Sequence, residues 1–238
     1  MTLHAEAPAR RVTCGFTAVL LDMDGTLVDS DAAVERSWRK WARRWGADPA
    51  AVLAVMTGHP AESTVRRVRP DLDEALVVAA TRDHLEHEYV DLADVVAAPG
   101  AHDLVAHLDA THTPWAVVTS ADARLARARL GAAGIEAPVI VPRDMVAEGK
   151  PAPDGYLMAA DFLAVDPTDC LVVEDSAVGV AAGRAAGATV AGLRGQPADI
   201  PVDSLSDVVP TLLAAEIQPA EIQPAEIQPA EIQQEVTA

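Results

Sequence analysis

The chain has 238 residues, of which 50% are hydrophobic and 23% are charged, and its formal net charge is −18 at pH 7. This composition is typical of one soluble globular domain, with or without a smaller insert, and the acidic charge excludes nucleic-acid binding through a general positive field. No apolar run approaches the roughly 20 residues of a membrane span, so we expect neither nucleic acid nor a membrane as a partner.

The first predicted element is a buried strand over residues 16–22, which runs directly into a cluster of acids. Asp22 ends the strand, and Asp24 follows it in the segment DMDGTLVDS. A carboxylate can attack phosphorus to form an aspartyl-phosphate, and a second carboxylate can protonate the leaving oxygen and then activate water. Gly25 lets the backbone turn closely around a phosphate. Because acids repel a phosphate dianion, the pattern also predicts a bridging hard cation, and Mg²⁺ with oxygen ligands is suited to this.

A helical insert is predicted after this strand, because the next strand begins near residue 115 and one crossover connection does not need about 85 residues. Val34, Trp38, Trp41 and Trp45 recur at spacings of four, three and four, so they form one helix face. We interpret this face as the core of a small helical domain rather than as a ligand-stacking surface. Further helices are predicted around 50–55, 62–68 and 72–92. The insert, residues 31–97, is expected to cap the strand ends, with hinges near 28–31 and 97–100.

From residue 101 onward the sequence alternates between helical and strand patterns. Helices are predicted over 101–110, 122–134, 153–165 and 176–188, and strands over 115–120, 138–142, 170–175 and 189–193. The strand segments are almost continuously apolar, which is typical of a parallel sheet that is covered on both faces. We therefore predict an α/β fold with a doubly wound parallel sheet, and its ligand site is expected at the carboxyl ends of the strands.

Three further polar motifs follow strands or precede a helix in this part of the chain. Thr119 and Ser120 end the second strand and offer hydroxyl and amide donors to a phosphate, while Lys150 supplies a positive charge before a helix. Glu174 and Asp175 end the fourth strand and offer metal carboxylates. Taken alone, each has an ordinary explanation, such as a helix cap, a solvated lysine or a loop acid. Their occurrence together at strand ends favours a site for phosphoryl transfer.

These motifs together resemble those of the haloacid dehalogenase (HAD) superfamily of aspartate-nucleophile phosphotransferases, and the resemblance covers roughly residues 15–212. It implies that Asp22 is the nucleophile and Asp24 the general acid/base. Thr119 matches the hydroxyl that binds phosphate, with Ser120 beside it, and Lys150 matches the lysine that steadies the nucleophile and the phosphate.

The resemblance also implies a Mg²⁺ site and a Rossmann-like core. The metal would be held by Asp22, Asp175 and the backbone carbonyl of Asp24, with Glu174 as a helper. The expected order of the five predicted strands in the sheet is 5-4-1-2-3. The implied domains are a core of residues 1–30 and 98–212 and a helical cap of residues 31–97.

The insert resembles the cap of the β-phosphoglucomutase-like branch, which contains mutases and phosphatases of sugar and polyol phosphates. Asp24 favours phosphoryl chemistry, because the dehalogenases of the superfamily lack the second aspartate. The mutases carry a cap-linker histidine where this chain has Val34, and a cap arginine near the loop where it has His59, Pro60 and Ala61. We therefore expect a Mg²⁺-dependent phosphatase, with a hexose-phosphate mutase as the alternative and a non-catalytic binding protein as a third hypothesis.

Specificity for the leaving alcohol is expected to come from the cap, where His59 and Glu62 are the predicted contacts to a small phosphorylated sugar or polyol. His59 also fits an ordinary turn position before Pro60. Asp29 and Ser30 are expected at the cap hinge and the start of its helix, and Asp29 could instead hydrogen-bond the site. We expect a monomer or a small homo-oligomer.

The ends of the chain and its cysteines complete the sequence-based predictions. The C-terminal part repeats AEIQP from residue 215, and proline at every fifth position interrupts helical hydrogen bonding, so residues 213–238 are predicted to be disordered or extended. The N-terminus lacks the apolar core of a signal peptide. Cys14 and Cys170 are too few for a disulfide framework and adjoin apolar runs, so we expect reduced thiols and a cytoplasmic protein.

Overall fold

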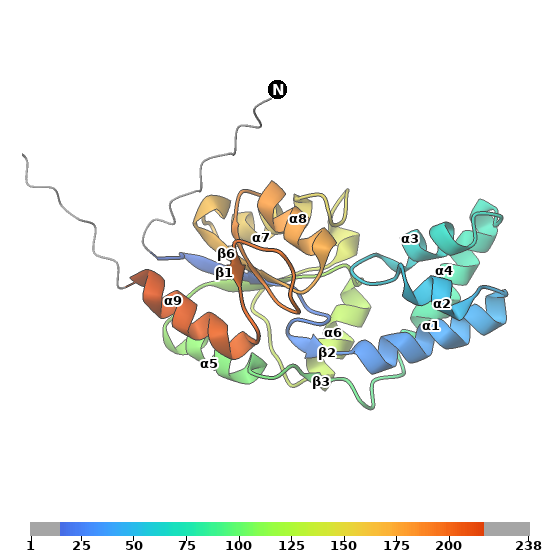
Figure 1. Cartoon of the computed structure of the whole chain (residues 1–238), viewed down its shortest axis with the longest axis horizontal. Helices are drawn as coiled ribbons and strands as arrows, with labels where there is room; N and C mark the ends of the chain where they lie inside the picture. The colour runs from blue at the N-terminus through green and yellow to red at the C-terminus, as the bar shows by residue number, and fades with distance from the viewer. Residues whose placement is uncertain (1–14, 217–238) are drawn as a thin grey trace, which may run out of the picture.

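The structure, a computed structural model, describes residues 15–216 and contains a parallel sheet of six strands (Figure 1). The sheet order is β5-β4-β1-β6-β7-β8. Its strands are β1 (Ala18–Leu21), β4 (Trp115–Val118), β5 (Ile140–Val141), β6 (Cys170–Glu174), β7 (Thr189–Gly192) and β8 (Ile200–Pro201). The predicted order of the five main strands is confirmed, and β8 is an additional edge strand that the sequence pattern did not reveal.

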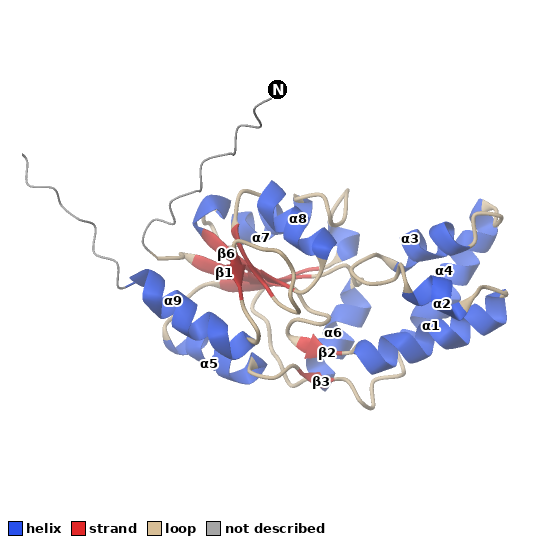
Figure 2. Cartoon of the chain, viewed as in Figure 1, coloured by secondary structure: helices blue, strands red, loops and turns tan. Residues whose placement is uncertain are grey.

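Helices cover both faces of the sheet, which explains why its strands are apolar on both sides (Figure 2). One face packs against α5 (Ala101–Ala110), α6 (Ala123–Ala132) and α9 (Val208–Glu216), and the other against α7 (Asp154–Phe162) and α8 (Ala177–Ala185). Val19 and Leu21 of β1 belong to the first layer of the core, and Ala18 and Leu20 to the second. Short 3₁₀ helices lie at Arg143–Met145, Pro167–Asp169 and Leu205–Asp207. The predicted doubly wound α/β core is confirmed.

The insert forms a separate helical layer beside the ends of the strands (Figure 1). It consists of α1 (Asp31–Trp45), α2 (Pro49–Leu53), α3 (Ala61–Val68) and α4 (Glu74–Glu88). Trp38 and Trp41 are buried in the core of this layer, and Trp45 packs against it, so the tryptophan face is structural as predicted. The last helix is shorter than the predicted 72–92: Asp73 caps its first turn by accepting a hydrogen bond from the Leu76 amide, and the helix ends at Glu88.

Two short antiparallel strands, β2 (Val28–Asp29) and β3 (Val96–Ala97), connect the cap to the core at the predicted hinge segments. Asp29 lies in this ladder and is exposed. The domain boundaries themselves stay a prediction, and α9 continues past residue 212 to Glu216. The rest of the AEIQP repeat and Cys14 lie outside the described residues. Every helix within residues 15–216 is too short or too polar to cross a lipid bilayer.

Candidate active site

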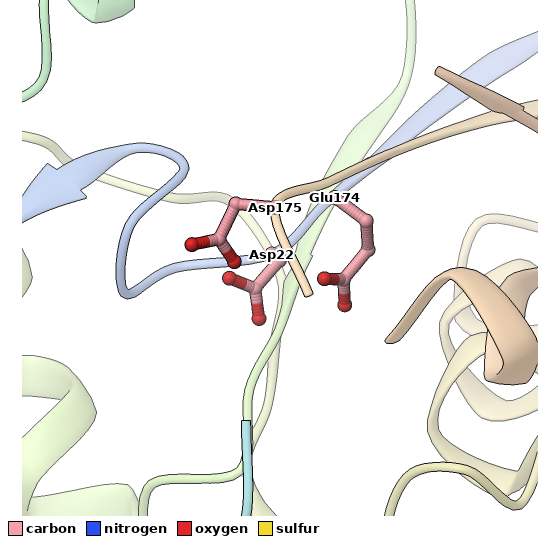
Figure 3. A group of neighbouring side chains, drawn as sticks. All are labelled: Asp22, Glu174 and Asp175. Carbon is pink, nitrogen blue, oxygen red and sulfur yellow. The ribbon is translucent and has the colours of Figure 1, made fainter. Parts of the chain in front are cut away.

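Three buried acids meet where β1 and β6 end side by side (Figure 3). Asp22, Glu174 and Asp175 are 7%, 0% and 6% exposed, and each offers a carboxylate oxygen within 4.8 Å of the others. The register of the parallel strands causes this meeting, because the Asp22 amide donates to the Val173 carbonyl at 3.0 Å. The structure therefore brings together acids that are 152 positions apart in the sequence.

Lys150 lies against two of these acids and is itself buried. Its Nζ is 2.5 Å from both Asp22 Oδ1 and Glu174 Oε1, and it donates to the Val118 carbonyl at 3.0 Å. Burial opposes the charge of Lys150, but the two neighbouring carboxylates outweigh it and raise the pKa of the ammonium group. Tyr156 of α7 donates to the same oxygen, Glu174 Oε1, at 2.7 Å. A fixed cation therefore lies beside the predicted nucleophile.

The three acids carry more negative charge than Lys150 can neutralise, and this excess raises the pKa values of two of them. Burial and the charge of Glu174 raise the pKa of Asp22 well above its ordinary value, although Lys150 opposes the shift. The same two causes raise the pKa of Asp175 to about 7, with Arg194 opposing. A divalent cation would relieve this repulsion, and the donors are all oxygen atoms, as Mg²⁺ prefers. The residues present fit the predicted metal.

Asp24 faces a different set of partners from the three clustered acids. Its Oδ1 accepts a hydrogen bond from Ser30 Oγ at 2.6 Å, and its Oδ2 lies 2.8 Å from Nη1 of Arg129. Among the predicted metal residues, Asp24 is therefore the one whose carboxylate points away from the acid cluster, and both of its oxygens contact neighbouring side chains. Arg129 was missed by sequence reasoning, because it lies among Arg124 and Arg127 on one helix and nothing in that spacing marks it as buried.

A cavity of about 830 Å³ lies between the strand ends and the cap. Its walls include almost all of the predicted site residues: Asp22, Asp24, His59, Glu62, Thr119, Ser120, Lys150 and Asp175. Glu174 is fully buried and is not one of the lining residues. The cap adds Trp38 and Leu85 to the walls, so that the cavity has apolar surfaces beside its charged end. A small phosphorylated molecule could place its phosphate at the acids and its carbon chain under the cap.

Comparison with known proteins decides the family. The model of the haloacid dehalogenase-like hydrolases matches residues 16–187, which is most of the chain. The chain belongs to this family. The resemblance deduced from the motifs is thus confirmed, and the HAD motifs are the ones that converge on the cavity.

Several HAD proteins are similar to this chain over most of their length. Hexitol phosphatase A of Escherichia coli is 46% identical over 76% of this chain and 84% of its own. The 2-deoxyglucose-6-phosphate phosphatase 1 of Saccharomyces cerevisiae is 33% identical over 73% of this chain and 78% of its own length. A crystal structure of β-phosphoglucomutase from Clostridium difficile superposes with a TM-score of 0.77 over 84% of this chain and 97% of that one, at 20% identity, and shows the shared fold. The prediction of an enzyme of the HAD phosphatase class is confirmed.

The remaining predicted binding residues of this HAD chain line the cavity, each with a protein partner. Thr119 Oγ1 accepts from the Ala121 amide at 3.0 Å, which leaves its hydroxyl hydrogen free to turn toward a ligand. Ser120 Oγ donates to the Gly58 carbonyl of the cap at 3.2 Å. A ring nitrogen of His59 lies 2.9 Å from the Thr57 carbonyl oxygen.

Glu62 is the most exposed of the predicted contacts, with 55% of its side chain accessible. It pairs with Arg66 of α3 at 2.8 Å, and Arg66 also lines the cavity. This arginine was not predicted, and one turn of helix separates it from Glu62. Contact of His59 and Glu62 with a substrate stays a prediction.

Proposed function

We propose that this HAD chain is a Mg²⁺-dependent phosphatase that hydrolyses small sugar or polyol phosphates through an aspartyl-phosphate on Asp22. One observation carries the proposal: the Asp22 carboxylate lies at the charged end of the cavity, 2.5 Å from a buried lysine and within the group of three acids. A buried carboxylate beside a cation and a metal site is arranged to meet a phosphate, and not to bind a neutral ligand.

In the first step, the phosphate of the substrate lies against Thr119, Ser120 and Lys150. An oxygen of Asp22 attacks phosphorus, the bond from phosphorus to the ester oxygen breaks, and Asp24 gives its proton to the departing alcohol. Mg²⁺ held by Asp22, Asp175 and the backbone carbonyl of Asp24, with Glu174 beside them, would neutralise the charge between the nucleophile and the phosphate. The ester alcohol leaves, and Asp22 carries the phosphoryl group.

In the second step, water attacks phosphorus as Asp24 takes its proton. The bond between phosphorus and the Asp22 oxygen breaks, which frees inorganic phosphate and returns Asp22 to its carboxylate and Asp24 to its protonated form. Lys150 stays within contact of Asp22 and supports the negative charge that returns to it. The two steps need one acid/base group, which is the role that the separate position of the Asp24 carboxylate suits.

The substrate class follows from the cap and from the relatives. Hexitol phosphatase A is the relative with 46% identity, which favours a phosphorylated sugar alcohol or a sugar phosphate of similar size for this chain. The cavity under the cap carries polar groups of His59, Glu62 and Arg66 and the apolar side chain of Leu85. Hydroxyl groups of a polyol can hydrogen-bond to these polar groups while its carbon chain packs against the apolar wall of the cavity.

The decisive experiment measures phosphate release from a panel of hexitol, sugar, glycerol and nucleotide phosphates with Mg²⁺ present. Asp22→Asn should abolish release, and Asp24→Asn should reduce it by about 10²–10⁴-fold, as expected for general acid–base catalysis. Asp103→Asn, an exposed change on α5, is the matched control. Near-normal turnover by Asp22→Asn would exclude the covalent mechanism. Steady release without a bisphosphate activator would separate the phosphatase from the mutase.

A second experiment tests the cap. His59→Ala and Glu62→Ala should lower kcat/KM for the best polyol phosphate far more than for a simple aryl phosphate. Loss of one hydrogen bond to a neutral hydroxyl should cost about 0.5–1.5 kcal/mol, and more for a charged partner. The exposed His102→Ala serves as the control. Equal losses on both substrates would mean that specificity lies elsewhere in the cap.

A further inference from the structure

A buried arginine of the core contacts both Asp24 and the cap. Arg129 of α6 is only 4% exposed, and its Nη1 lies 2.8 Å from Asp24 Oδ2. Its Nη2 donates to Oε1 of Glu88 at 2.7 Å. Glu88 is the last residue of α4, so one guanidinium group connects the acid/base in the core to the end of a cap helix.

Glu88 is held in turn from within the cap. Its Oε2 lies 3.2 Å from Nε2 of His84, and the His84 ring stacks on Trp38 with the ring centroids 3.5 Å apart. Burial opposes ionisation of Glu88, but His84 and Arg129 lower its pKa, so the side chain is a carboxylate at neutral pH. Glu88 is therefore held between the buried Arg129 and a histidine whose ring packs on Trp38.

The end of α4 is also fixed on α6 by contacts next to this ion pair. Tyr89 donates to Oδ2 of Asp122 at 2.6 Å, and Asp122 is the N-cap of α6. The guanidinium of Arg124 lies 3.8 Å from the centroid of the Tyr89 ring. These contacts keep Glu88 in place opposite Arg129, so the position of the guanidinium depends on how the cap helix docks.

We propose that Arg129 is a positioning residue that orients Asp24, and that Glu88 of the cap fixes Arg129 for this task. The inference rests on the proposed function, in which Asp24 transfers the proton. Ser30 holds one oxygen of the Asp24 carboxylate and Arg129 the other, so both together define its plane. A displacement of about 1 Å in such a group can cost about 10²-fold in rate. The cap thus contributes to the chemistry as well as to substrate recognition.

The test separates the two chemical steps by the leaving group. With 2,4-dinitrophenyl phosphate the first step needs no proton from Asp24, whereas the second step still needs Asp24 to activate water. In Arg129→Gln the first turnover should therefore stay within a few-fold of the wild-type rate, while steady turnover falls by about 10–100-fold and a burst of dinitrophenol appears. With a polyol phosphate kcat should fall by a similar factor, and KM should change little.

Further variants distinguish positioning from simple loss of stability. Arg129→Lys keeps the charge but loses the planar fork, so it should restore the melting temperature more than the steady rate. Arg129→Gln leaves the Glu88 carboxylate buried without its cation, which lowers stability by itself. Glu88→Gln removes that charge and keeps Arg129, so it should show the same burst of dinitrophenol with a smaller loss of steady rate. Arg127→Gln, an exposed change on the same helix, is the control and should behave as wild type.

Equal losses in the first turnover and in steady turnover, in either Arg129→Gln or Glu88→Gln, would overturn the positioning role, and so would unchanged kinetics in both. A wild-type chain that releases no phosphate from any ester, or an Asp22→Asn variant that keeps its activity, would instead overturn the proposed function. The two failures are therefore distinguishable in the same set of measurements.

Discussion

Gly25 offers a sharp test of the metal site, because a side chain there would collide with a proposed ligand. Gly25 lies three residues after Asp22 and its own φ is +83°. A Cβ atom at this position would lie 2.1 Å from Oδ2 and 2.8 Å from Cγ of Asp175. Ordinary van der Waals contact begins near 3.4 Å, so in Gly25→Ala the Asp175 carboxylate must move by more than an ångström.

Two separable effects follow from this substitution. The positive φ alone should cost about 1–2 kcal/mol of stability, because an L side chain meets its own backbone there. The movement of Asp175 should in addition weaken Mg²⁺ binding, since Mg²⁺ demands near-ideal geometry with ligands at about 2.0–2.1 Å. We expect the Mg²⁺ half-saturation to rise about 10–100-fold, equivalent to about 1.4–2.8 kcal/mol.

The assay is the Mg²⁺ dependence of phosphate release, together with thermal unfolding in the presence and absence of Mg²⁺. Gly46→Ala is the matched control, because Gly46 has φ of +67° but its nearest new contact would be Arg69 Nη1 at an ordinary 3.8 Å. It should lose stability without any change in the Mg²⁺ half-saturation. A folded Gly25→Ala protein with the Mg²⁺ response of the wild type would refute the assignment of Asp175 as a metal ligand.

Three further predictions concern the metal, the cap core and the free thiol. Chelation should remove activity and Mg²⁺ should restore it, while Ca²⁺ should bind and inhibit because its coordination is longer and looser; full activity in excess chelator would contradict the oxygen-ligand site. Trp41→Ala should cost about 3–5 kcal/mol in urea unfolding, because the ring is fully buried and its Nε1 donates to the Ala80 carbonyl at 2.8 Å. A loss below about 1 kcal/mol, as for a surface substitution, would contradict this. Burial and the nearby acids Asp169 and Asp166 raise the pKa of the Cys170 thiol to about 11. In a Cys14→Ser variant, a thiol reagent at pH 8 should therefore react at least about 100-fold more slowly with the native chain than with the unfolded chain. Equal rates would show that the thiol is accessible.

The elements and the chemistry of the core could be predicted from the sequence, because their signals are local. An apolar run that ends in DMDGT describes both a strand buried on two faces and the acid pair that follows it, and the tryptophan spacing describes one face of a helix. The short strands β2, β3 and β8 were missed, since each spans two residues; β5 is equally short but could be predicted because it lies within the apolar run of residues 138–142.

The partners of these acids were decided only by the tertiary structure. Asp22 and Asp24 are two residues apart, yet one carboxylate joins Glu174 and Asp175 and the other joins Ser30 and Arg129. The direction of each side chain depends on the turn that Gly25 permits and on strands and helices that arrive from distant parts of the chain. Arg129 is buried between Asp24 of the core and Glu88 of α4, and no pattern within α6 records those contacts.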